Sequence, residues 1–159
     1  MNKSIQLLIE ESTSLLAQLI AIPSLSREET HTADCISHFL IERGISNNQV
    51  GNNVIAYNKY FDENKPTILL NSHHDTVKPN PGYTKDPFEA IFVDGKLYGL
   101  GSNDAGGCLV ALIATFLYYY ADSDLTYNLC LIASAEEEIS GKNGIEEAYK
   151  HVVPCAFAI

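Results

Sequence analysis

Positive charge is scarce in this sequence, and the scarcity limits the partners that it can bind. The 159 residues carry 10 basic side chains against 20 acidic ones, a formal net charge of −10. Nucleic acids and anionic membranes attract proteins of the opposite balance, so we expect neither as a partner. The acidic excess has two explanations: a solvated surface, or carboxylates held together to bind divalent cations.

Closely spaced cysteines are also missing. The sequence has four cysteines, none of them in a CxxC pair. This spacing argues against a zinc knuckle and against a thioredoxin-like redox pair. Isolated cysteines in mostly apolar stretches are typical of buried free thiols in a reducing compartment, so we expect a cytoplasmic protein.

No segment has the pattern of a membrane span or a secretory leader. Glu10 and Glu11 interrupt the first apolar pattern, which is wrong for a signal peptide. The apolar run over 108–120 is too short to cross a bilayer and predicts a buried helix. Repeats, low-complexity segments and linkers are absent too, so we expect residues 1–159 to form part of one domain.

Helix-type and strand-type patterns alternate along the chain. Helices are predicted over 5–20, from a capping box of Ser26 and Glu29 to about 43, and over about 104–121 and 143–151. Strands are predicted over 54–57, 67–71, 127–133 and from 157, with a hairpin over 91–98 that turns at Asp94-Gly95. This alternation predicts an α/β fold with a mixed, mostly parallel sheet and helices on both faces.

Three motifs place metal-binding side chains at the ends of these elements. His73 and Asp75 follow one apolar run, Asp104 opens a helix, and Glu137 and Glu138 follow another strand. Ligands of open α/β sheets bind beyond the carboxyl ends of the strands, so the three motifs can converge there. Imidazole and carboxylate ligands suit a hydrolytic zinc centre that leaves room for water.

Each motif has a simpler explanation when it is taken alone. A single histidine near a strand end is usually structural, and this remains our expectation for His74. The acidic run over 136–138 could be a solvated helix start, where the helix dipole favours negative charge. His31, His38 and His151 are expected to be solvated. Only the ordered set of motifs favours a metal site.

Four segments also resemble a known family when they are read in order: 73–79 (HHDTVKP), 86–88 (DPF), 94–104 (DGKLYGLGSND) and 136–141 (EEEISG). Together they are similar to the N-terminal half of the dizinc amidohydrolase and peptidase family. That family includes acetylornithine deacetylase, succinyl-diaminopimelate desuccinylase, aminoacylase and carboxypeptidase G. The similarity covers nearly the whole chain and is greatest to members resembling acetylornithine deacetylase.

The resemblance implies a role for each motif residue. His73 would bind one zinc ion, Asp104 would bridge two, and Glu138 would bind the second. Glu137 would be the general base and acid, and Asp75 would hold the far nitrogen of His73. Cobalt or manganese could substitute for zinc. The resemblance further implies a cis peptide bond between Asp104 and the following alanine.

The resemblance also implies an activity: hydrolysis of the amide bond of a small N-acyl amino acid, as in arginine biosynthesis. The family's remaining ligands and its lid, which mediates homodimer formation, lie outside this sequence. We therefore expect this chain, as an incomplete zinc-peptidase-like catalytic domain, to bind zinc poorly and to turn over little alone. Two alternatives remain: a non-catalytic fragment or binding module on the same scaffold, and a di- or tripeptidase.

Three departures from the family pattern leave the substrate preference open. Leu100 stands where the family usually has arginine, and Ala105-Gly106 where it has Met-Lys. Tyr83 replaces a tryptophan that often precedes the Asp-Pro-Phe segment. None of these positions is one of the expected metal ligands.

Overall fold

The structure is a computed structural model that describes residues 4–159. The helices and short helical turns are α1 (Ile5–Ile20), α2 (Thr30–Ile41), η1 (Ser102–Gly106), α3 (Gly107–Tyr119), η2 (Glu137–Ile139), α4 (Ile145–Ala148) and η3 (Tyr149–His151). The strands are β1 (Asn47–Val50), β2 (Asn53–Tyr57), β3 (Thr67–His73), β4 (Ile91–Val93), β5 (Lys96–Tyr98), β6 (Asn128–Ser134) and β7 (Phe157–Ala158).

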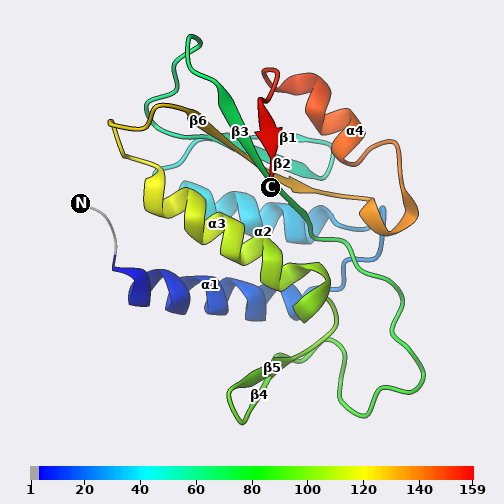
Figure 1. Cartoon of the computed structure of the whole chain (residues 1–159). Coiled ribbons are helices and arrows are strands. Elements are labelled where there is room, and N and C mark those ends of the chain that lie inside the picture. The colour runs from blue at the N-terminus through cyan, green and yellow to red at the C-terminus, as the bar shows by residue number, and fades with distance from the viewer. Residues whose placement is uncertain (1–3) are drawn as a thin grey trace.

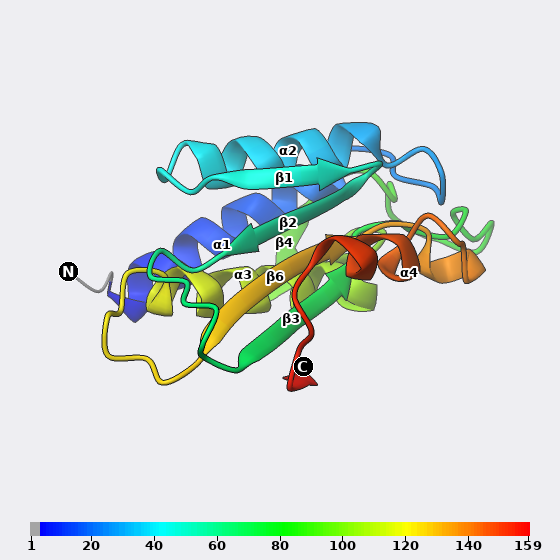
Figure 2. The same ribbon diagram turned by 90° about the horizontal axis from the view of Figure 1, so that it is seen from above.

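Five strands form one mixed sheet in the order β1-β2-β6-β3-β7, and β4 and β5 form a separate hairpin. The pairs β1–β2 and β2–β6 are antiparallel, whereas β3 is parallel to both β6 and β7. The register of β3 and β6 sets His73 opposite Ser134. The two central strands therefore end at the same edge of the sheet, as Figure 2 shows.

Helices cover both faces of the sheet, as predicted. Figure 1 shows α1, α2 and α3 together on one face and α4 on the other. The larger apolar core lies beneath the three helices, where Leu15, Ile36 and Phe116 are fully buried. A smaller cluster on the other face includes Ile132 and Ala148. Because successive residues of β6 point to opposite faces, this fully buried strand contributes to both clusters.

The predicted elements are present with some corrections. Strand β1 was missed because its sequence, NNQV, is mostly polar. The last predicted helix is only α4 followed by η3, and α3 begins at Gly107 rather than at Asp104. The predicted capping box is wrong, because Glu29 is the residue before α2 and no side chain caps that helix.

The cysteine prediction holds only in part. All four thiols are free, but only Cys130 is fully buried, and Cys108 is exposed. The period of α3 explains this difference, since Leu109, Val110 and Ile113 face the core and position 108 lies on the outer side. Within residues 4–159, no helix combines the length and the apolar character that crossing a membrane requires.

Candidate metal centre

The carboxyl ends of β3 and β6 carry the expected site residues. His73 is the last residue of β3, and Glu137 and Glu138 lie in η2, which follows β6 closely. Asp104 lies in η1, where its backbone is extended at φ −117° and ψ 100° rather than helical. The peptide bond between Asp104 and Ala105 is cis, which confirms that prediction. Gly106 lets η1 approach α1 closely, since a Cβ atom there would lie 2.7 Å from Leu16 Cδ1.

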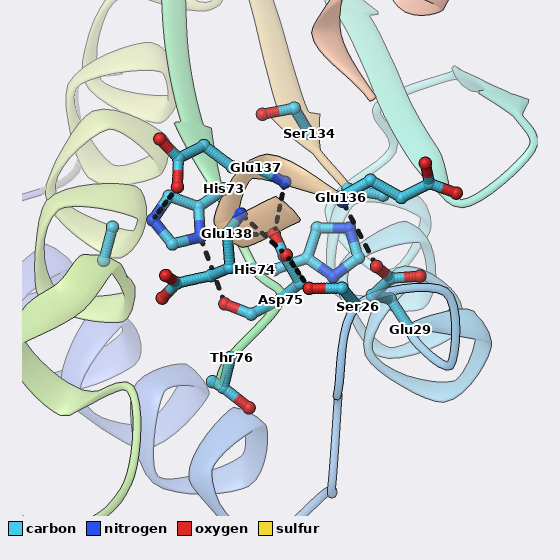
Figure 3. Close-up of polar contacts among 12 residues, drawn as sticks. Ser26, Glu29, His73, His74, Asp75, Thr76, Ser134, Glu136, Glu137 and Glu138 are labelled. Carbon is cyan, nitrogen blue, oxygen red and sulfur yellow. Dashed lines mark hydrogen bonds and ion pairs between the residues drawn. The ribbon is translucent and has the colours of Figure 1, made fainter. Parts of the chain in front are cut away.

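Three of these side chains form one group. His73, Asp104 and Glu138 each offer a ligand atom, and these atoms all lie within 4.8 Å of one another. The His73 Nε2 atom is 3.2 Å from Asp104 Oδ1 and 3.6 Å from Glu137 Oε2. In Figure 3 the carboxylates of Glu137 and Glu138 lie on either side of the His73 ring. The structure therefore brings together residues that are far apart in the sequence.

Asp75 orients the His73 ring from below the cluster. The His73 Nδ1 atom is 3.3 Å from Asp75 Oδ1 and 3.1 Å from the Asp75 carbonyl oxygen. Burial alone would lower the pKa of His73, but the Asp75 carboxylate, followed by those of Asp104 and Glu137, raises it to about 9. The ring is thus held by Nδ1, and Nε2 faces the exposed carboxylates.

The Asp75 carboxylate is fully buried and serves several donors at once. Its Oδ1 accepts the backbone N–H of Glu137 at 3.0 Å, and its Oδ2 accepts that of Glu138 at 3.1 Å. The Ser26 hydroxyl also donates to Oδ2, at 2.7 Å. Burial would raise the pKa of Asp75, but the hydrogen bonds from His73, Ser26 and the two amides lower it to about 2.

The outer carboxylates are far more accessible. The Asp104 side chain is 79% exposed and the Glu137 side chain 58%, whereas that of His73 is 8% exposed. Partial burial, and next the nearby charge of Asp104, raise the pKa of Glu138. Like charges gathered at a water-facing surface favour a cation, which would offset their repulsion.

A second layer of buried polar residues lies behind the cluster. Glu29 is fully buried and accepts the backbone N–H of Glu136 at 3.1 Å. The buried His74 contacts Thr32 Oγ1 at 2.8 Å and the Asn52 carbonyl at 2.9 Å, which confirms its structural role. Burial lowers the pKa of His74, and this effect exceeds the opposing influence of its hydrogen bond and of nearby acidic groups.

Ser26, Glu29 and Glu136 are the parts of the site that sequence reasoning missed. Their spacing suggested a helix cap or a solvated acidic run, whereas their partners are distant in the sequence. Ser26 bonds to a residue 49 positions away, and Glu29 to one 107 positions away. A local pattern carries no signal for such pairs. Only the fold shows that the two acidic residues, Glu29 and Glu136, are buried.

The donor set fits a divalent metal ion. One imidazole and two carboxylates can each supply an atom to a common point, and the imidazole has its other nitrogen held by a carboxylate, as metal-binding histidines usually do. His73, Asp104 and Glu138 would hold the metal. Glu137 would stand beside it with its carboxylate facing solvent.

Comparison with known proteins identifies the family. Residues 69–157 match Peptidase family M20/M25/M40, and this chain belongs to that family of metal-dependent hydrolases. Succinyl-diaminopimelate desuccinylase of Rickettsia bellii is 26% identical over 148 residues, which cover 88% of this chain and 38% of the relative. Acetylornithine deacetylase of Proteus mirabilis is 43% identical over 74 residues, which cover 46% of this chain and 19% of the relative.

Solved structures agree with the fold. Human carnosine dipeptidase 1 superposes with a TM-score of 0.73 at 22% identity, over 92% of this chain and 36% of that one. The YXEP protein of Bacillus subtilis, described as a dinuclear metal-binding peptidase of the M20 family, gives 0.67 at 22% identity, over 92% and 40%.

The predicted family is therefore confirmed, and the α/β class with it. The chain spans 38% of the length of the desuccinylase that it matches. Desuccinylase, deacetylase and dipeptidase relatives all match, so membership in this family of hydrolases does not determine a substrate.

Proposed function

We propose that this chain is the metal-binding part of an enzyme that hydrolyses the amide bond of an N-acyl amino acid. The single observation that carries the proposal is the group of His73, Asp104 and Glu138, whose ligand atoms lie within 4.8 Å of one another. Membership in a hydrolase family and the likeness to a deacetylase and a desuccinylase support the substrate class.

Each residue has a distinct role in this proposal. His73 would bind one zinc ion, Asp104 would bridge two, and Glu138 would bind the second. Two cations close together need a shared anion between them, and Asp104 is the most exposed of the three side chains. When bound, the metal ions polarise the scissile carbonyl and make a water molecule more acidic.

Glu137 is the proposed general base and acid. Its carboxylate is 58% exposed and lies 3.6 Å from His73, so it can reach a water molecule beside the metal ligands. It takes a proton from that water and passes it to the leaving nitrogen. Asp75 keeps the His73 ring oriented and holds the backbone of Glu137 in place.

The Glu137→Gln variant of the full-length enzyme tests this assignment. Glutamine keeps the size of the side chain but cannot accept the proton, so turnover of an N-acetyl or N-succinyl amino acid should fall by about 10²–10⁴-fold. Metal content, measured by elemental analysis, should stay at the wild-type value. Near-normal turnover would remove Glu137 from the role of base.

A dipeptidase is the second candidate, because the mouse Beta-Ala-His dipeptidase is 35% identical over 89 residues of this chain. A peptide and an N-acyl amino acid present the same scissile amide to the same metal centre. Parallel assays of the full-length enzyme with acetylornithine, succinyl-diaminopimelate and β-alanyl-histidine separate the candidates. A kcat/KM highest for the dipeptide would favour the second.

The remaining expectations belong to the same proposal. We expect a cytoplasmic enzyme that forms a homodimer at full length and has neither nucleic acid nor membrane as a partner. Among residues 4–159 the ligand group has three members shared between two proposed metal ions. Catalytic zinc sites usually have about three protein ligands each, so this chain alone should bind zinc weakly.

A further inference from the structure

The turn that carries Glu137 and Glu138 is held by hydrogen bonds to its backbone. Three successive N–H groups, those of Glu136, Glu137 and Glu138, each donate to a buried carboxylate. Asp75 accepts the second and third of these, and Glu29 accepts the first (Figure 3). Asp75 touches His73 directly, whereas Glu29 contacts none of the expected metal ligands through its side chain in the structure.

Glu29 is placed as an anchor. It is fully buried, and its side chain accepts three hydrogen bonds: from the Arg27 N–H at 2.6 Å, from Asn52 Nδ2 at 2.8 Å and from the Glu136 N–H at 3.1 Å. A carboxylate can accept all three at once, and such charge-assisted bonds are stronger than neutral ones. The main chain of Glu29 is also held, because Glu29 is the residue before α2 and its carbonyl accepts the Ala33 N–H at 2.9 Å.

The anchored residue has an unusual backbone. Glu136 has a positive φ of 53°, in the left-handed region that residues with a side chain rarely adopt. Its own carboxylate is nearly buried and accepts from Asn143 Nδ2 at 3.0 Å. Both the entry and the side chain of this turn are therefore held, so the conformation of Glu136 sets the direction in which the next two side chains leave.

We propose that Glu29 is a positioning residue for the metal centre: it fixes the Glu136 backbone and thereby aims Glu137 and Glu138 at His73. This inference rests on the proposed function for the metal part alone. Without Glu29, a buried N–H at the start of the turn loses its acceptor, and the turn is free to leave the left-handed conformation. Small displacements of catalytic groups have large effects, because their geometry is otherwise preorganised.

The test uses the ¹⁵N-labelled 159-residue chain and two measurements that need no activity. Amide hydrogen exchange at positions 136–138 reports the hold on the turn, and titration with Zn²⁺, followed by the His73 ring signals, reports the metal site. In Glu29→Ala, exchange at Glu136 should quicken by about tenfold. The zinc Kd should rise by about tenfold, as with other residues that support metal ligands.

Two further variants separate positioning from general stability. Glu29→Gln keeps an oxygen for the Glu136 N–H, so it should restore both measurements to within about threefold of wild type. Asn128→Ala removes a buried amide at the opposite end of β6, where it bonds to Asp62 and Lys65 carbonyls. It should destabilise the fold while leaving exchange at 136–138 and zinc affinity near wild type.

The outcomes decide between the explanations. If Glu29→Ala matches Asn128→Ala in both measurements, Glu29 is only structural and the inference is overturned. If Glu29→Ala does not fold, Glu29→Asp takes its place, because its shorter side chain withdraws the acceptor from Glu136, and it should shift both measurements in the same direction. Because this chain alone should bind zinc weakly, the titration extends to a large excess of Zn²⁺. If His73 shows no zinc-dependent change even there, the proposed metal function fails, whereas the exchange measurement still tests the anchor.

Discussion

The two ends of the β3–β6 strand pair are closed by different chemistry. At the amino end, the buried Asn128 donates to the carbonyls of Asp62 and Lys65, and the buried Asn58 accepts the Leu129 N–H at 2.8 Å. At the carboxyl end, the buried carboxylates of Asp75 and Glu29 accept the backbone N–H groups of the turn over 136–138. Charged side chains lie at both ends, since the Lys65 ammonium donates to the Leu125 carbonyl at the amino end, but only the carboxyl end uses fully buried carboxylates.

The buried carboxylates indicate that the carboxyl end of the strand pair orients functional side chains. A neutral amide satisfies backbone groups at a lower desolvation cost than a carboxylate, so closing a strand does not require buried acids. A carboxylate adds a stronger hold on N–H groups and on an imidazole. Fully buried charge is therefore placed where side chains must be oriented, whereas the charged residues of the turn at the amino end, Asp62 and Lys65, are only partly buried.

The largest effect should come from removing the charge at the carboxyl end. Asp75→Ala leaves the His73 imidazole and the N–H groups of Glu137 and Glu138 without their shared acceptor. We expect a loss of about 3–5 kcal/mol in the free energy of unfolding, as for other broken buried pairs. Zinc affinity should fall by roughly 10–100-fold. Urea denaturation and zinc titration measure the two effects.

Asp75→Asn is the matched control, since it keeps the shape and one acceptor oxygen. It should fall between wild type and Asp75→Ala in both measurements. An alanine variant as stable as wild type, with unchanged zinc affinity, would mean that the carboxylate does not organise this end of the sheet.

A second effect concerns pH. The pKa of His73 is raised from 6.5 to about 9 in the metal-free fold, and that of Asp75 is lowered from 3.8 to about 2. The contribution of His73 to stability is therefore complete below about pH 6.5 and is lost as the pH rises through 9. The contribution of Asp75 is present above about pH 4 and is lost as the pH falls through 2.

Zinc binding has the opposite dependence to the His73 contribution, because a metal takes only the neutral imidazole. Zinc affinity should rise about tenfold for each pH unit between 6.5 and 8, with release of about one proton. Calorimetry in buffers of different ionisation enthalpy measures that proton. An affinity that does not change over this range would contradict the assignment of His73 as a ligand.

The smallest effect on the site should come from the amino end. Asn128→Ala should cost about 1–3 kcal/mol of stability, because it leaves buried backbone groups unpaired. Zinc affinity should change by less than about twofold, since distant sites act additively. Chemical denaturation and zinc titration on the same sample decide this. A large loss of zinc affinity would show that the two ends are coupled and not separate.

Local patterns were enough to predict most of the fold. The spacing of apolar residues predicted α1, and the Asp94-Gly95 turn predicted the β4–β5 hairpin, because in each case the signal lies within one element. Polar β1 carried no such signal and forms by pairing with β2 along the chain. The helix expected over 143–151 is shorter, because a 3-10 turn follows α4 directly.

The site, like the fold, has one part that the sequence predicts and another that it does not. His73, Asp104 and Glu138 could be predicted to meet, because each follows or precedes a recognisable element and the ends of parallel strands share an edge. The roles of Ser26 and Glu29 could not, since the same two residues also fit the spacing of a capping box. Only the tertiary fold decides that they bond to Asp75 and Glu136 instead.

The parallel pairing of His73 with Ser134 limits where this chain can change in length. Adding or deleting one residue inside β3 would turn the imidazole to the other face of the sheet, away from Asp104, and the same change inside β6 would turn Ser134 and shift the turn that carries Glu137 and Glu138. The exposed connection over 80–86 has no such restriction, because it is not paired with any strand and therefore has no register to keep. Length variation among natural or engineered versions of this protein should therefore concentrate in that connection and avoid the two central strands.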